Sequence, residues 1–280
     1  CKIFKEYVMV DRMSVAILDM NNGFPNQGLR CIKEIVAQFA DEVSFEVFDV
    51  RQFNEIPDLS FDIYISSGGP GSPLLEGLPW EAPYFKLLED VYAFNKSDKG
   101  NKKYMFLICH SFQLACGFFK LGELTKRKST SFGIHPVHKT RAGYKDELFR
   151  ELPDPFFVVE SRDWQVIQPD LATFEKKGCE LLALEKMRSH VDYERALMAV
   201  KFSDEIYGTQ FHPEADPVGL DKYLRMDDTR EKLVSQFGEE KYLRTLAQTA
   251  NPNKIELTKE MILPGFIRNC IHKMQHLEMT

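Results

Sequence analysis

The stretch YMFLICHSFQLACGFF, residues 104–119, combines the pattern of a short buried strand with that of a helix. Four apolar residues come directly before Cys109, and the apolar residues after it recur at helical spacing. A strand that runs into a helix here places Cys109 at the corner between them. A cysteine at such a corner is either packing material or a nucleophile directed at a pocket, and this stretch alone fits both.

Strand and helix patterns alternate on both sides of this corner. The predicted strands lie at 14–20, 43–50, 61–67 and 102–109, and the predicted helices lie at 29–40 and about 81–96. This rhythm implies right-handed βαβ crossovers. We therefore expect an α/β fold with a mainly parallel, open, flavodoxin-like sheet flanked by helices. Short apolar runs between residues 133 and 214, among them FFVVES and QVIQ, predict a small antiparallel addition.

A helical and charged pattern fills the C-terminal part of the chain, residues 225–280. Its apolar residues recur at helical spacing, and an amphipathic stripe of this length must bury itself against something. The stripe either packs back on the core or forms the surface that binds another subunit. No linker rich in Pro, Gly or Ser precedes it, so we expect a helical C-terminal extension that packs on the core.

Composition and charge narrow the class of protein. The 280 residues are 44% hydrophobic and 28% charged, which is typical of a soluble enzyme. The net charge is −6 with both signs mixed along the chain, so we expect no nucleic-acid partner. No apolar run reaches 18 residues and the start lacks a secretory signal, so we expect no membrane span and a cytoplasmic location. Six cysteines without a CxxC pair indicate buried, reduced thiols.

Two further segments carry side chains and loops that a nucleophilic cysteine needs. The segment IYGTQFHPEADP, residues 206–217, is read as a strand that ends in His212 and Glu214, a base and a carboxylate that could orient it. The segment YISSGGPGSP, residues 64–73, is a strand that ends in a glycine loop whose backbone N–H groups could hold an oxyanion. Taken alone, the HPE segment is more readily a polar turn, and the glycine loop could be an ordinary glycine turn.

Together the three segments resemble class I glutamine amidotransferases, the Cys-His-Glu glutaminase family, over roughly residues 14–224. That family has a GGP loop, a G-x-C-x-G-x-Q elbow and a strand that ends in HPE. The resemblance implies a glutamine amidotransferase domain over 1–224 followed by the extension over 225–280. It also implies no cofactor, no metal and the following roles: nucleophile Cys109, base His212, orienting acid Glu214, oxyanion-hole N–H groups of Gly69 and His110, and substrate contacts at Gly68, Gln113, Ser161 and Trp164.

This sequence departs from the family pattern at three positions near the expected site. Leu107 and Ser111 stand where the family usually has glycine, two residues before and two residues after the nucleophile. Small neighbours relieve crowding at a strained elbow, so Leu107 puts the packing there in question. Arg162 follows Ser161 where many members have a Ser-His pair that touches the bound amino acid.

The implied reaction is hydrolysis of the side-chain amide of L-glutamine through a γ-glutamyl thioester on Cys109. The released ammonia implies an acceptor or a separate synthetase subunit, because no ATP-binding glycine loop is present in the sequence. Two alternatives remain open at this point. The same triad could serve a γ-glutamyl hydrolase, a peptidase or an acyltransferase, or the scaffold could be a non-catalytic binding protein. Whether the chain forms a homo-oligomer is also left open.

Overall fold

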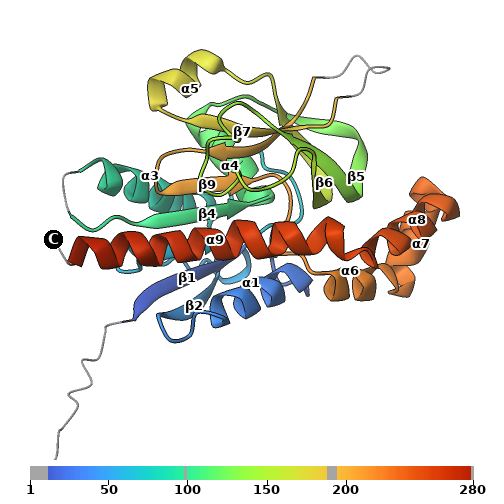
Figure 1. The fold of residues 1–280 in the computed structure, drawn as a ribbon, viewed down its shortest axis with the longest axis horizontal. Helices are drawn as coiled ribbons and strands as arrows, with labels where there is room; N and C mark the ends of the chain where they lie inside the picture. The colour runs from blue at the N-terminus through green and yellow to red at the C-terminus, as the bar shows by residue number, and fades with distance from the viewer. Residues whose placement is uncertain (1–11, 98–99, 188–193, 279–280) are drawn as a thin grey trace, which may run out of the picture.

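The structure is a computed structural model that describes residues 12–97, 100–187 and 194–278 (Figure 1). The strands are β1 (Met13–Asp19), β2 (Val43–Asp49), β3 (Ile63–Ser66), β4 (Tyr104–Ile108), β5 (Glu123–Lys139), β6 (Phe156–Ile167), β7 (Glu180–Glu185), β8 (Leu197–Lys201) and β9 (Ile206–Thr209). The helices are α1 (Gln27–Ala37), α2 (Val50–Phe53), α3 (Glu81–Lys96), α4 (His110–Phe119), α5 (Leu171–Lys177), α6 (Pro217–Leu224), α7 (Asp227–Phe237), α8 (Glu239–Thr249) and α9 (Pro252–Glu278).

The described strands form one nine-stranded sheet in the order β2-β1-β3-β4-β9-β8-β7-β5-β6. The first five strands in this order run parallel, and the other four pair in antiparallel fashion. β4 pairs with β9 so that Ile108 lies opposite Thr209. This register brings the residues that follow the two strands to the same edge of the sheet. The predicted α/β fold, with its mainly parallel sheet, antiparallel addition and helical extension, is confirmed.

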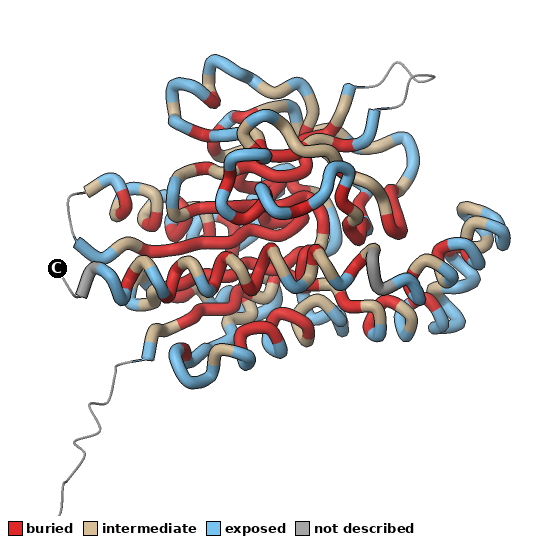
Figure 2. The backbone as a smooth tube through the Cα atoms, in the orientation of Figure 1, coloured by how far each residue is buried: buried red, intermediate tan, exposed pale blue. Residues whose placement is uncertain are grey.

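Helices cover both faces of the parallel strands because successive strand residues point to opposite sides. On one face, Val15, Ile17 and Phe106 pack with apolar residues of α1 and α9. On the other face, Ala16 and Leu107 pack with α3 and α4. Figure 1 shows α9 lying across the sheet on the first face, and Figure 2 shows that the buried stretches concentrate in the strands and in the side of α9 that faces them. The two clusters hold the strands that carry the site.

The antiparallel part differs from the sequence expectation in one detail. FFVVES and QVIQ, expected as separate short strands, belong to the single strand β6, which pairs with β5 in a long hairpin. The polar residues between the two runs interrupt the apolar pattern but not the strand. Arg162 lies in this interruption. It is buried, and its Nε is 2.8 Å from a carboxylate oxygen of Glu160, with which it forms an ion pair. Charged residues that pair inside one strand thus have the sequence pattern expected of a loop between two strands.

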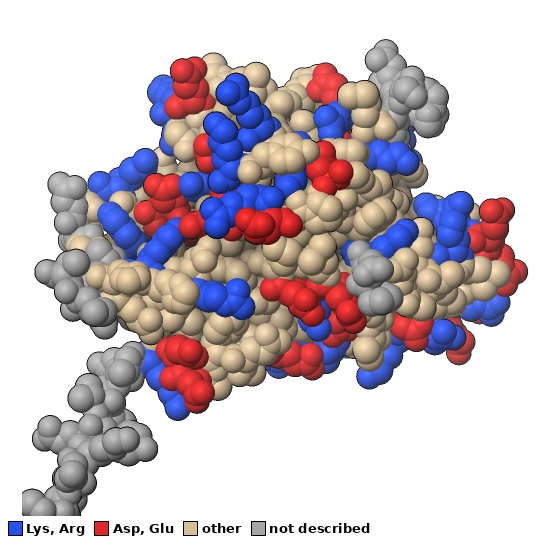
Figure 3. Space-filling view, in the orientation of Figure 1, with Lys and Arg blue, Asp and Glu red and all other residues tan. Residues whose placement is uncertain are grey.

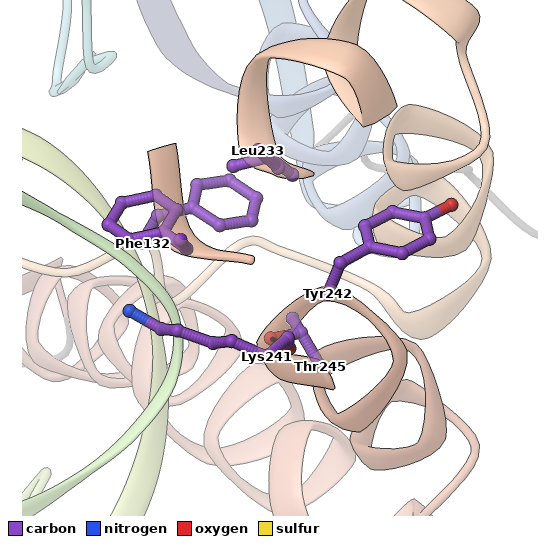
Figure 4. A pocket seen from close by; sticks show the side chains of 6 residues that line it. Phe132, Leu233, Lys241, Tyr242 and Thr245 are labelled. Carbon is purple, nitrogen blue, oxygen red and sulfur yellow. Dashed lines mark hydrogen bonds between the residues drawn. The ribbon is translucent and has the colours of Figure 1, made fainter. Parts of the chain in front are cut away.

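The C-terminal helices pack on the molecule at two places. α9 contributes Ile262, Leu263, Phe266, Ile267 and Cys270 to the main core cluster. Helices α6 to α8 cover β5 and β6, where Leu224, Leu233 and Tyr242 pack with Phe132. Figure 4 shows a small pocket at this junction, with Phe132 of β5 facing Leu233 of α7 and Thr245 of α8. The division into a domain of 1–224 and an extension of 225–280 packed on it stays a prediction. Residues 1–11 of the first domain lie outside the described residues.

The surface charges and the cysteines concern two expectations from the sequence, namely charges of both signs mixed together and buried, reduced thiols. On the face shown in Figure 3, Lys and Arg side chains are interspersed with Asp and Glu. The cysteines within the described residues, Cys31, Cys109, Cys116, Cys179 and Cys270, are buried and free. Across the described ranges, no helix is both long and apolar enough to cross a membrane.

Candidate active site

Cys109 occupies the corner between β4 and α4 in a backbone conformation that residues other than glycine seldom adopt. Its φ is 49° and its ψ is −96°, outside the regions that ordinary residues populate. Its backbone N–H donates to the Thr209 carbonyl of the neighbouring strand at 2.7 Å. The pairing of β4 with its neighbours therefore holds the strained residue in place. The expected strand-to-helix corner is present, and Cys109 is only 5% exposed at the carboxyl edge of the sheet.

His212 and Glu214 follow β9 and lie beside this corner. Nδ1 of His212 is 2.9 Å from Oε1 of Glu214, so the turn does fold the carboxylate back onto the ring. The carboxylate accepts the Nδ1 hydrogen, which fixes the tautomer and leaves Nε2 for another partner. The Cys109 side chain lies close enough to the imidazole to raise the pKa of His212. The three side chains expected to form a triad are thus brought together.

The electrostatics of this group favour a charged imidazole. Burial opposes that charge, but the Glu214 carboxylate and the Cys109 side chain together raise the pKa of His212 well above its ordinary value. Glu214 is 1% exposed, and its Oε2 has no hydrogen-bond partner within the described part of the chain. The arrangement is therefore suited to a proton that moves between sulfur and imidazole.

The glycine loop after β3 lies against the same group. A Cβ atom added at Gly68 would lie 2.8 Å from Cε1 of His212 and 3.3 Å from Cβ of Cys109, so only glycine fits. A Cβ atom at Gly69 would overlap the Met20 carbonyl. The loop approaches the end of β1 closely because it carries no side chain at these two positions. The backbone N–H groups of Gly69 and His110 have no hydrogen-bond partner among the described residues.

The His110 ring does not share the chemistry of His212. It is 1% exposed, and neither ring nitrogen has a partner among the described residues. Burial, assisted by the Arg51 guanidinium, lowers the pKa of His110 to about 3. The ring is therefore neutral at physiological pH.

The expected substrate contacts on β6 differ in how they are placed. The Ser161 carbonyl, rather than its hydroxyl, is 3.9 Å from Sγ of Cys109. Trp164 is half-buried, and its carbonyl accepts a hydrogen bond from Gln113. Arg162, which stands in the family's histidine place, is buried and pairs with Glu160. This side chain is 1% exposed and is therefore not presented to a substrate.

The two departures at the elbow have structural explanations. Leu107 is fully buried among residues of α3 and α4, so it belongs to the core and does not crowd the elbow. Ser111 donates from Oγ to the Ser67 carbonyl at 2.7 Å and contacts Oγ of Ser66 at 2.8 Å. A serine at this position therefore ties the first turn of α4 to the end of β3, just before the glycine loop.

Sequence reasoning missed two residues at this site. Gln210 donates from Nε2 to Sγ of Cys109 over 3.7 Å. Arg51 donates to the Met20 and Pro70 carbonyls and braces the glycine loop. Gln210 could have been found, because it lies two residues before His212 and alternate residues of an extended chain share a side. Arg51 lies far from the loop in sequence, and no local pattern marks it.

Comparison with known proteins places this arrangement in a family. The family model described as glutamine amidotransferase class-I matches residues 19–228. The chain belongs to the class I glutamine amidotransferase family. The match includes the glycine loop, the Cys109 corner and the segment with His212 and Glu214.

Individual relatives are distant. The chain is 23% identical over 194 residues to a homoserine O-acetyltransferase of Catenibacterium mitsuokai, which covers 69% of this chain and 57% of that protein. It thus spans little more than half of that curated relative. A glutamine amidotransferase structure from Thermotoga maritima is 15% identical, with a TM-score of 0.69 over 93% of this chain and 98% of that one. One from Methylobacillus flagellatus is also 15% identical, with a TM-score of 0.59 over 95% and 92%. These two likenesses show the fold.

Proposed function

We propose that this amidotransferase-family protein is a cysteine-dependent glutaminase that hydrolyses the side-chain amide of L-glutamine. The observation that carries the proposal is the position of His212, which contacts Glu214 and lies beside Cys109 against Gly68 at the carboxyl edge of the sheet. A thiol, a base and a buried acid in this order are what acyl transfer through a thioester needs.

The proposed reaction begins when the Cys109 proton moves to His212. The thiolate attacks the amide carbon, and the oxyanion that forms accepts hydrogen bonds from the N–H groups of Gly69 and His110. His212 then gives its proton to the leaving nitrogen, which departs as ammonia. Water activated by His212 attacks the γ-glutamyl thioester and releases glutamate. Glu214 keeps the imidazole in the required tautomer throughout.

The ammonia is proposed to serve an acceptor-activating or synthetase subunit. Class I glutamine amidotransferases commonly transfer ammonia in this way, and this role fits the family to which the chain belongs. A cytoplasmic location accompanies the proposal. The oligomeric state is left to measurement.

A second candidate is acyl transfer from a thioester donor to a hydroxyl group. Two observations favour it: the likeness to a homoserine O-acetyltransferase, and the buried, Glu160-paired Arg162 in place of the family histidine. In that reaction Cys109 displaces the donor thiol, and the acceptor oxygen then attacks the acyl thioester on Cys109. Each step exchanges one acyl bond for another, so no oxidant or reductant is required.

The test compares the two reactions on one preparation. Ammonia release from L-glutamine is measured for the wild type and for Cys109→Ala, and acetyl transfer from an acetyl thioester to homoserine is measured in parallel. Glutaminase activity predicts ammonia that depends on Cys109 and no acetyl transfer. Acetyl transfer without ammonia release would establish the second candidate instead. If the Cys109→Ala variant kept whichever activity the wild type shows, that result would contradict both candidate functions.

A further inference from the structure

A chain of side-chain amides connects β6 with the candidate nucleophile. Gln113 on α4 donates from Nε2 to the Trp164 carbonyl at 3.1 Å and to Oε1 of Gln210 at 3.0 Å. Gln210 follows β9 directly and donates from its own Nε2 to Sγ of Cys109 at 3.7 Å. Gln210 is fully buried and Gln113 is 3% exposed. Water therefore does not compete for these hydrogen bonds.

The Trp164 carbonyl sets the direction of this chain. A backbone carbonyl only accepts, so Gln113 must present its NH₂ group there. The second hydrogen of that NH₂ group is left for Gln210, which must accept with its oxygen. The NH₂ group of Gln210 then faces the sulfur. The Trp164 carbonyl, separated from the sulfur by the side chains of Gln113 and Gln210, thus determines that the NH₂ end of the Gln210 amide faces Cys109.

The sulfur has two hydrogen-bonding neighbours that favour opposite protonation states. A thiol can donate to the Ser161 carbonyl at 3.9 Å, which offers nothing to a thiolate. The N–H group of Gln210 donates to the sulfur and binds the thiolate more strongly, because a charged acceptor forms the stronger hydrogen bond. Two charged or titratable side chains also act on this sulfur, His212 after β9 and Arg162 on β6.

We propose that Gln210 is a further catalytic residue that stabilises the Cys109 thiolate, and that Gln113 is a positioning residue that holds Gln210 in the required orientation. The thiol proton moves to Nε2 of His212, and the electron pair stays on the sulfur, where the Gln210 N–H group donates to it. Both amide hydrogens of Gln113 are used inside the protein. The consequence for turnover rests on the proposed function, whereas the effect on the thiol does not.

The test measures how fast iodoacetamide alkylates Cys109 at a series of pH values, with adducts mapped by mass spectrometry. Gln210→Met keeps the length of the side chain and removes the donor. A hydrogen bond to a charged group contributes about 1.5–3 kcal/mol, so the midpoint of the alkylation profile should rise by about 1–2 pH units. The same loss should lower kcat for glutamine about 10- to 100-fold with KM nearly unchanged.

Gln113→Met should move the profile in the same direction but less, and it tests the relay if Gln210→Met does not fold. Gln236→Met is the matched control: it removes an amide that hydrogen-bonds Thr130 from α7, away from the thiol. The control should leave both the profile and kcat unchanged. Alkylation profiles that match the wild type in both folded variants would overturn the proposal.

The two proposals fail in different ways. Should the wild type release no ammonia while Gln210→Met still raises the alkylation midpoint, the glutaminase function fails and the role of Gln210 stands. A variant whose profile is unchanged but whose kcat falls would overturn the role of Gln210 at the thiol and leave the glutaminase function intact.

Discussion

The φ and ψ of Cys109 place this residue under backbone strain that the surrounding strands hold. Strain of this kind costs about 1–3 kcal/mol and is retained where a side chain must project toward a ligand. Here it turns the thiol toward His212 instead of into the cluster around Leu107. The same corner places the His110 N–H group at the first turn of α4, where a helix leaves backbone donors unpaired.

His212 and Glu214 allow a prediction of pH dependence. The reactive form pairs a thiolate with a protonated imidazole, and that form is lost as the pH rises through the pKa of His212. Glu214 raises this pKa against the opposing effect of burial. Glu214→Gln removes the raising charge, so the alkaline limb of the kcat/KM profile should move to lower pH.

Rates for three variants complete this prediction. His212→Ala should lower kcat by about 10²- to 10⁴-fold, because it removes the base itself. Glu214→Gln should cost less, because its role is to orient the ring. Exposed Glu231→Gln on α7 is the control and should behave as the wild type. Equal losses in His212→Ala and Glu214→Gln would show that Glu214 does more than orient.

At the scale of single elements, the first turn of α1 shapes the triad. Gly28 is the second residue of this helix, and a Cβ atom there would lie 2.9 Å from Oε1 of Glu214. The carboxylate thus rests against a helix N-terminus, whose partial positive charge favours it. The absence of a side chain at Gly28 makes room for Glu214.

Gly28→Ala should therefore lower kcat by displacing the carboxylate from His212, although alanine favours a helix interior by about 1 kcal/mol over glycine. Steady-state kinetics and the alkaline limb of the pH profile report the effect, which should resemble that of Glu214→Gln. Gly100→Ala is the matched control, because a Cβ atom there meets nothing within 4 Å. Full activity in Gly28→Ala would show that Glu214 tolerates the displacement.

At the scale of the whole molecule, α9 acts as part of the core. Its side chains Ile262, Leu263 and Phe266 pack with strand residues of the parallel sheet, and Phe266 contacts the rings of Phe106 and Tyr207 edge-on. Each such side chain contributes about 1.5–3 kcal/mol on burial. The helix therefore stabilises the strands on which the candidate site is built.

Truncation after Met226 should make the protein aggregate or lower its melting temperature sharply, because it uncovers this face of the sheet. Differential scanning fluorimetry and size-exclusion chromatography measure both effects. Phe266→Ala should cost about 3–5 kcal/mol, whereas Leu243→Ala, 55% exposed on α8, should change stability by less than about 0.5 kcal/mol. A truncated protein that stays folded and active but changes oligomeric state would identify the extension as an interface.

The fold and the three segments of the site could be predicted because their signals are local. Apolar runs, the Cys109 corner and the HPE turn each lie within about ten consecutive residues, and parallel strands bring their carboxyl ends together. The role of Arg51 escaped prediction because it depends on which segments become neighbours, whereas Gln210, two residues before His212, carried a local signal that was overlooked. The sequence predicts two short strands in place of β6, because the charged residues of the buried Glu160–Arg162 ion pair interrupt the apolar pattern.

The most direct test of the central claim is to trap the nucleophile. The protein is treated with a glutamine-like chloroketone, with and without excess L-glutamine, and the adduct is located by peptide mass spectrometry. The account predicts one adduct on Cys109, formed more slowly when glutamine is present and absent in Cys109→Ala. Cys116 and Cys179 should stay unmodified, because burial raises the pKa of both thiols. Labelling that falls mainly on Cys116 or Cys179, or that glutamine does not slow, would contradict the assignment of Cys109 as a glutaminase nucleophile.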